Sequence, residues 1–206
     1  MITVHHLNES RSQRVLWLLE ELGLAYEIMP YQRDTKTRLA PPELKAVHPL
    51  GKSPVLQDGD TKLIESGAIV DYLIRRHGGG RLQPPADSPE YNQYQQWLHY
   101  AEGSAMLPLM LNLYVSRLGN AGAPLQPRID SELANHLGFI DGSLGDRPWL
   151  LGSEFSGADV QMSFVGEAAR GLRRSYPDLD AWVRRFQQRP AYQRAIERGG
   201  PYSLAD

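Results

Sequence analysis

The sequence contains no cysteine among its 206 residues. This absence excludes disulfide bonds and every mechanism in which a thiol of the protein itself reacts. A protein of this composition that performs thiol chemistry must take its sulfur from a ligand. The lack of cysteine also fits a reducing cytoplasm.

An excess of charge of one sign is missing too, because 22 Lys and Arg residues nearly balance 24 Asp and Glu residues. Nucleic acids and acidic membrane surfaces require a concentrated basic surface, so neither is an expected partner. The longest apolar run, residues 107–115, is far shorter than the ~20 residues that span a bilayer. The first eleven residues include Glu9 and Arg11 in place of an apolar core. We therefore expect no signal peptide and a cytoplasmic location.

Side chains spaced for metal binding are also missing. His5 and His6 are adjacent on an expected strand and point to opposite faces. The remaining histidines stand singly, without the spacing of a chelating pair. No metal site is expected.

The first third of the chain alternates strand and helix patterns. Residues 2–7 and 26–31 alternate as strands, and residues 15–22 have helical spacing that Gly23 is placed to end. Two strands joined by a helix of this length form a parallel, right-handed crossover.

The stretch from Ser53 to Ser66 carries the strongest local signals. Proline after Ser53 belongs at the first residue of a strand, and a cis bond there would leave the Ser53 backbone exposed to an extended peptide. Asp58-Gly59 then predicts a tight hairpin, and the second strand runs into Glu65 and Ser66 at the start of a helix.

The Glu65–Ser66 junction has two interpretations. The Ser66 hydroxyl and the first free amides of the helix suit a carboxylate, and the Glu65 carboxylate suits an ammonium group, so the junction can hold a small amino acid by both ends. Alternatively, Ser66 only caps its helix and Glu65 is a surface acid at a positive helix end.

A Gly- and Pro-rich stretch marks the clearest boundary in the chain, and everything after it has helical spacing. We expect domains at residues 1–77 and 89–206, joined by a linker at residues 78–88. Ser156 and Asp159 form a capping-box signature at the start of a buried helix and receive a folding role.

The motifs LGKSPVL and LIESGAIVDYL, with SRSQRVLWLLEELGL before them and FSGADVQM near the C-terminus, resemble the cytosolic glutathione S-transferase family over nearly the whole chain. The resemblance implies an α/β thioredoxin-like N-terminal domain and an all-α C-terminal helical domain. It also implies glutathione as co-substrate and a homodimer, with the serine-type branch of bacteria and fungi as the nearest. The glutathione-binding residues that it implies are Lys52, Ser53, Pro54, Glu65 and Ser66.

The implied reaction needs the thiol of glutathione as a thiolate, and a free thiol has a pKa of about 8.5. The family places a tyrosine, serine or cysteine near the end of the first strand. Ser10 is our first candidate and Ser12 the second, because a hydroxyl at a helix N-terminus can donate to the sulfur. A structural alternative for Ser10 is a capping box with Gln13.

A hydrophobic substrate is expected between the domains, against the first helix after the linker. Tyr and Met side chains make adaptable apolar walls, and core packing is the alternative role for each of them. The candidates are Tyr100, Met106, Met110 and Tyr114.

We therefore expect an enzyme that conjugates glutathione to small hydrophobic electrophiles. Glutathione-dependent reduction of organic hydroperoxides is an alternative, because it uses the same thiolate. A non-catalytic protein-interaction module is a second alternative, and the presence of Ser10, Pro54, Glu65 and Ser66 together argues against it.

Overall fold

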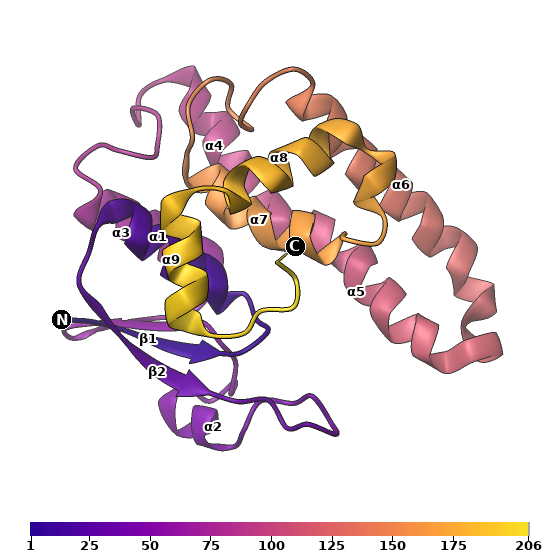
Figure 1. Ribbon diagram of the computed structural model, residues 1–206, viewed down its shortest axis with the longest axis horizontal. Coiled ribbons are helices and arrows are strands. Elements are labelled where there is room, and N and C mark those ends of the chain that lie inside the picture. The colour runs from indigo at the N-terminus through magenta and orange to yellow at the C-terminus, as the bar shows by residue number, and fades with distance from the viewer. Residues whose placement is uncertain (206) are drawn as a thin grey trace. The chain divides into compact units, whose positions relative to one another are not determined.

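The computed structural model describes residues 1–205, which form two compact units (Figure 1). The first unit comprises Met1–Gln83 and the C-terminal segment from Phe186, and the second comprises Pro84–Arg185. The C-terminal segment thus packs with the N-terminal part of the chain. The domain ranges expected from the sequence stay a prediction.

A four-stranded mixed sheet forms the first unit, in the order β2-β1-β3-β4. The central strand β1 pairs parallel with β2 and antiparallel with β3, which forms a hairpin with β4. This sheet confirms the predicted crossover and hairpin. The strands are β1 (Ile2–Leu7), β2 (Tyr26–Tyr31), β3 (Val55–Asp58) and β4 (Thr61–Leu63).

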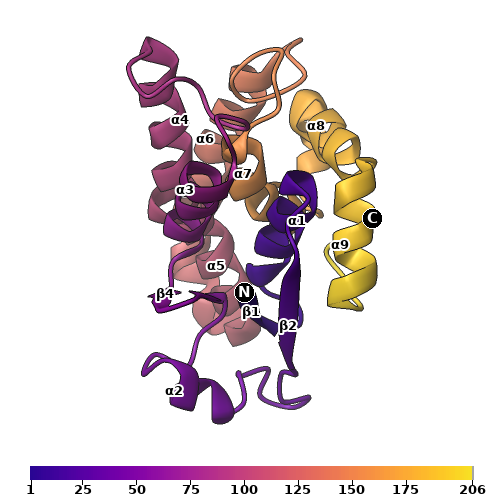
Figure 2. The ribbon, with the colours of Figure 1, turned by 90° about the vertical axis from the view of Figure 1, so that its left-hand side faces the viewer.

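Four helices complete this unit. In both ribbon views α1 and α3 lie on one side of the strands, α2 lies on the other, and α9 lies beside α1 (Figures 1 and 2). Val4, Leu18 and Ile69 are fully buried, so the sheet and the two helices share an apolar core. The bounds are α1 (Ser12–Leu22), α2 (Glu43–Val47), α3 (Ser66–His77) and α9 (Pro190–Gly199).

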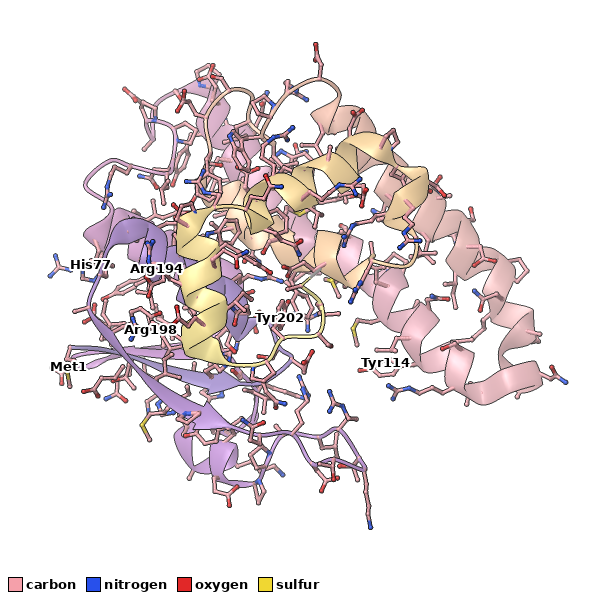
Figure 3. All side chains as sticks on the ribbon, in the orientation of Figure 1. Met1, His77, Tyr114, Arg194, Arg198 and Tyr202 are labelled. Atoms are coloured by element: carbon pink, nitrogen blue, oxygen red, sulfur yellow. The ribbon has the colours of Figure 1, made fainter. Side chains whose placement is uncertain are left out.

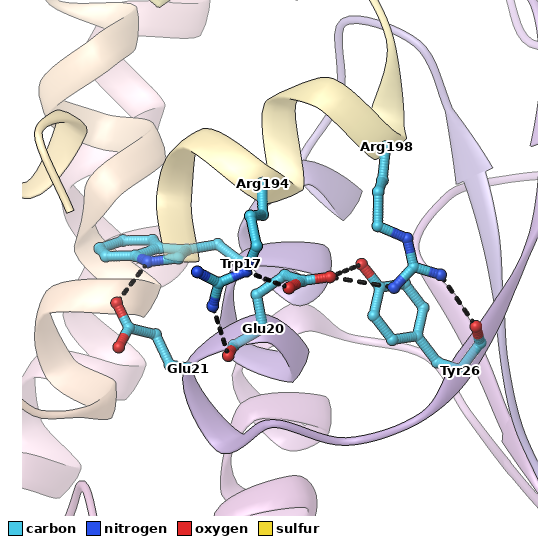
Figure 4. Close-up of polar contacts among 6 residues, drawn as sticks. All are labelled: Trp17, Glu20, Glu21, Tyr26, Arg194 and Arg198. Atoms are coloured by element: carbon cyan, nitrogen blue, oxygen red, sulfur yellow. Dashed lines mark hydrogen bonds and ion pairs between the residues drawn. The ribbon is translucent and has the colours of Figure 1, made fainter. Parts of the chain in front are cut away.

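Ion pairs attach α9 to α1 (Figure 4). Glu20 accepts from Arg194 at 2.8 Å and from Arg198 at 2.9 Å, and Arg198 lies over the Tyr26 ring, 3.8 Å from its centroid. One turn away, Arg189 binds Glu21 through two N–H groups. Arg194 and Arg198 can be followed along one side of α9 in Figure 3.

The second unit is helical, as the sequence predicts. Within it, α7 packs against α4 and α5 packs against α6. The residues of α7 up to Glu167 are all buried, and the Ser156–Asp159 capping box forms at its start. A π-helix, Ala101–Ala105, joins α4 to α5 just before Pro108. The helices are α4 (Pro89–Tyr100), α5 (Met106–Val115), α6 (Gln126–Leu144), α7 (Gly157–Ala168) and α8 (Pro177–Gln187).

Among residues 1–205, no helix has both the length and the apolar character needed to cross a membrane.

Candidate functional site

The Ser53–Pro54 turn lies against the end of β1. The Ser53 hydroxyl donates to the carbonyl of His5 at 2.8 Å and accepts from the N–H of Leu7 at 3.1 Å. The Ser53–Pro54 bond is cis, and within residues 1–205 the backbone N–H and C=O of Ser53 make no hydrogen bond. Ser53 thus offers a donor and an acceptor to an extended peptide. Lys52, the preceding residue, is exposed.

The junction between β4 and α3 brings Glu65 and Ser66 to a helix start. Glu65 is exposed and has φ 65° and ψ 111°, a conformation that L-residues rarely adopt. Such a backbone costs on the order of 1–3 kcal/mol and is often found at functional sites. Ser66 is buried, and the first helical hydrogen bond runs from the Ile69 N–H to the Glu65 carbonyl. The amides before Ile69 therefore lie at the positive end of the helix.

Arg14 is a site residue that our sequence reasoning missed. It lies in α1, is 2% exposed, and donates from Nη1 to the Ser66 hydroxyl at 3.3 Å. A guanidinium stays charged at all relevant pH values, so it makes this junction more favourable for an anionic group. The feature of the sequence that could have identified Arg14 is its position directly before the apolar run Val15–Leu19.

Ser10 and Ser12 share one hydrogen-bonded group at the start of α1. Their hydroxyl oxygens are 2.7 Å apart, and Ser10 Oγ accepts from the Ser12 N–H at 3.2 Å. The reciprocal capping box with Gln13 does not form, because the buried Gln13 side chain has no hydrogen-bond partner within residues 1–205. Ser10 therefore stabilises the start of α1 by accepting from the Ser12 N–H, and not through a capping box with Gln13.

His6 joins this group from β1. Its Nδ1 lies 2.8 Å from Ser12 Oγ, and its Nε2 lies 3.1 Å from the carbonyl oxygen of Gly199, at the end of α9. Burial lowers the pKa of His6, and the hydrogen bond to Gly199 opposes this only in part. The available signal was the alternation of Ile2, Val4 and His6, which places His6 on a buried face.

The four residues proposed for the hydrophobic substrate all lie in the second unit. The Tyr100 hydroxyl oxygen lies 2.6 Å from Nδ1 of His136, and the Tyr100 ring packs against Trp97 and Phe139. Burial raises the pKa of Tyr100 to about 12. The exposures of the other three increase along α5: Met106 is buried, Met110 is half-buried and Tyr114 is 56% exposed. Tyr114 is labelled on α5 in Figure 3.

Within residues 1–205, no group of three or more His, Cys, Asp or Glu side chains is arranged to hold a metal ion.

Comparisons with known proteins agree with this arrangement of elements. A family model described as the glutathione S-transferase N-terminal domain matches residues 1–75, and one described as the C-terminal domain matches residues 104–190. Glutathione S-transferase 1 of Saccharomyces cerevisiae is 34% identical, over 96% of this chain and 95% of the relative. Glutathione S-transferase 3 of Schizosaccharomyces pombe is also 34% identical, over 96% of this chain and 88% of the relative.

Solved structures show the same likeness. A glutathione S-transferase from Actinobacillus pleuropneumoniae superposes with a TM-score of 0.88 and 35% identity, covering 99% of this chain and 95% of its own. A glutathione transferase family member from Pseudomonas fluorescens, with two glutathione molecules bound, has a TM-score of 0.78 and 26% identity. That match covers 95% of this chain and 92% of the other.

Proposed function

The chain belongs to the glutathione S-transferase family and is a glutathione transferase, and we propose that it conjugates glutathione to small hydrophobic electrophiles. The observation that carries the glutathione site is the Glu65–Ser66 junction. An exposed carboxylate there stands beside a buried hydroxyl that is bonded to the guanidinium of Arg14.

In this proposal the two ends of an amino-acid head group meet opposite charges. The ammonium group pairs with Glu65, and the carboxylate accepts from the Ser66 hydroxyl and from the first amides of α3, near Arg14. The peptide part of glutathione pairs with the Ser53 backbone, with Pro54 and Lys52 beside it. Ser10 then faces the sulfur at the start of α1.

Calorimetry of glutathione binding tests the assignment of Glu65. We expect Glu65→Ala to weaken binding by roughly 1.5–3 kcal/mol, because it removes a hydrogen bond to a charged group. Glu27→Ala is the matched control, since it removes one exposed carboxylate from β2 of the same unit. Unchanged affinity in Glu65→Ala would remove Glu65 from the site.

The reaction itself is tested with two panels of second substrates. Halogenated aromatics report conjugation, and organic hydroperoxides report reduction by the same thiolate. We expect faster turnover with the halogenated aromatics. Turnover of hydroperoxides alone would instead make this protein a peroxidase.

Met110 and Tyr114 are the proposed substrate-wall residues to vary first, because Met106 is buried and its substitution would disturb packing.

A further inference from the structure

Resting on the proposed function, we propose that His6 takes the proton of the bound thiol through a hydrogen-bonded chain formed by Ser10 and Ser12. The chain runs from Ser10 Oγ to Ser12 Oγ at 2.7 Å, and from Ser12 Oγ to His6 Nδ1 at 2.8 Å. It ends at the Gly199 carbonyl, 3.1 Å from His6 Nε2. All three side chains are at most 4% exposed.

The directions of these hydrogen bonds follow from the Gly199 carbonyl, at which the hydrogen-bonded chain ends. A carbonyl oxygen only accepts, so Nε2 of His6 must carry a hydrogen and donate to Gly199. Burial lowers the pKa of His6, so the resting ring is neutral and its Nδ1 accepts. The Ser12 hydroxyl therefore donates to Nδ1 at 2.8 Å, a shorter contact than the one to the Leu7 carbonyl at 3.3 Å, and the Ser10 hydroxyl donates to Ser12.

This direction leaves Ser10 as an acceptor toward a ligand. A hydroxyl has one donor and two acceptor positions. The donor of Ser10 is used on Ser12, and one acceptor position is used by the Ser12 N–H. The position that remains can accept a thiol proton, whereas it cannot donate to a thiolate.

Proton transfer reverses the Ser10–Ser12 and Ser12–His6 hydrogen bonds at once and leaves the His6–Gly199 bond unchanged. The thiol proton moves to Ser10 Oγ, the Ser10 proton moves to Ser12 Oγ, and the Ser12 proton moves to His6 Nδ1. The products are a thiolate that accepts from Ser10 and an imidazolium that donates to Ser12 and Gly199. The charges balance, with one negative charge on sulfur and one positive charge on His6. The thiolate then forms a C–S bond with a halogenated electrophile as its C–halogen bond breaks and halide leaves, and the imidazolium releases its proton to solvent.

No charged side chain among residues 1–205 contributes to the lowered pKa of His6. The groups that meet its ring are Ser12 of α1 and Gly199 of α9, and Pro30 is its neighbour in β2. Of the arginines along these helices, Arg14 binds Ser66, Arg198 binds Glu20, and Arg11 lies at the N-cap of α1, next to Ser12. The negative charge that can stabilise an imidazolium here is the thiolate itself.

Helix α9 positions the Gly199 carbonyl that accepts from His6. A Cβ atom on Gly199 would lie 2.7 Å from Gln13 Oε1 and 2.9 Å from Leu16 Cδ1, so a larger residue here would require the ends of these two side chains to move. The ion pairs of Glu20 with Arg194 and Arg198 attach the same helix to α1 (Figure 4). The C-terminal helix thereby sets the hydrogen position on His6.

The test counts protons while glutathione binds to the full-length protein. Thiolate formation is followed by its ultraviolet absorbance, and proton release is measured by calorimetry near neutral pH in two buffers of different ionisation enthalpy. If His6 keeps the proton, thiolate forms with almost no release to the buffer. Release of one proton to the buffer for each thiolate formed would overturn the proposal. This measurement uses the wild-type protein alone. Failure of glutathione to bind at all contradicts the proposed function instead.

His6→Asn sharpens this test, because its amide oxygen can still accept from Ser12 but cannot take a proton at neutral pH. We expect the thiolate fraction below neutral pH to fall about tenfold, and the thiolate formed at higher pH to release one proton. His5→Asn is the matched control, since the His5 ring contacts Tyr31 and not the serines. Normal thiolate and an unchanged proton count in His6→Asn would reduce His6 to a structural role.

Discussion

Ser10 and Ser12 lie two residues apart, but only Ser10 has hydrogen-bonding capacity left for a ligand. The Ser12 hydroxyl is fully buried, with Ser10, His6 and the Leu7 carbonyl around it. Ser10 has one acceptor position remaining. The structure therefore favours Ser10 as the residue that meets the sulfur, and Ser12 as its support.

Replacing Ser10 by Ala should raise the pKa of the bound thiol by roughly 1–2 units, because a charge-assisted hydrogen bond is worth about 1.5–3 kcal/mol. Thiolate and turnover should then fall about 10- to 100-fold below neutral pH, with much less change in glutathione affinity. Titration of the thiolate absorbance measures the shift.

The local role of Ser10 predicts a different result for the same variant. Loss of its bond to the Ser12 N–H alone would cost about 0.5–2 kcal/mol of stability and leave the thiolate titration normal. Urea unfolding of Ser10→Ala, run beside the absorbance titration, distinguishes the two. A normal titration in a destabilised variant would remove Ser10 from the chemistry.

At the scale of elements, α9 is attached to the sheet unit by charge. Burial alone would raise the pKa of Glu20, but hydrogen bonds from Arg194, Tyr26 and Arg198 outweigh this effect and lower it. The Glu20 side chain is only 12% exposed, whereas its partner Arg194 is 52% exposed, so this ion pair is neither fully exposed nor fully buried. The helix therefore depends on this carboxylate for part of its docking energy.

We expect Glu20→Gln to lower the free energy of unfolding by about 1–3 kcal/mol, between the values for exposed and buried pairs. Urea unfolding measures the loss. Asp71→Asn is the control, because the Arg75–Asp71 pair on α3 is exposed and should contribute less than ~0.5 kcal/mol. Equal losses in the two variants would show that Glu20 contributes no more than a surface pair.

Elements with a local signal were predicted well from the sequence. The alternation at residues 2–7 and 26–31, the Asp58-Gly59 turn and the Ser156–Asp159 box each lie within a few residues, and all four formed. The His6–Gly199 contact joins residues 193 positions apart. No local periodicity encodes such a pair, so sequence analysis placed His6 on its strand but missed its partners.

At the scale of the whole molecule, the family resemblance implies a homodimer. Sedimentation at micromolar concentration tests this, and we expect a species of about twice the 23.2 kDa chain mass. A single species at the chain mass would exclude a stable dimer and any residue contributed by a partner chain.

The stability of the molecule should also carry a distinct pH dependence from Asp159. This carboxylate is fully buried and accepts from the Leu150 N–H, the Trp182 ring and Ser156. Burial raises its pKa to about 6, although these donors offset part of the effect. The folded protein therefore binds more protons at Asp159 than the unfolded chain does between about pH 4 and 6.

Stability from this group is fully present below the unfolded pKa of about 3.9 and is lost as pH rises through about 6. The shift of about two units corresponds to about 3 kcal/mol. Asp159→Asn should be less stable than the wild type at every pH, because an amide cannot accept from all of these donors. We expect the stability difference between the two proteins to shrink by about 3 kcal/mol from pH 4 to pH 7.

Urea unfolding of both proteins at several pH values and one protein concentration measures this difference. Glu20 and Asp58 have lowered pKa values and lose their stabilising effect as pH falls, in the opposite direction to Asp159. Both proteins contain these residues, so subtraction removes their contribution and isolates position 159. A difference that stays constant with pH would mean that the donors around Asp159 fully offset its burial.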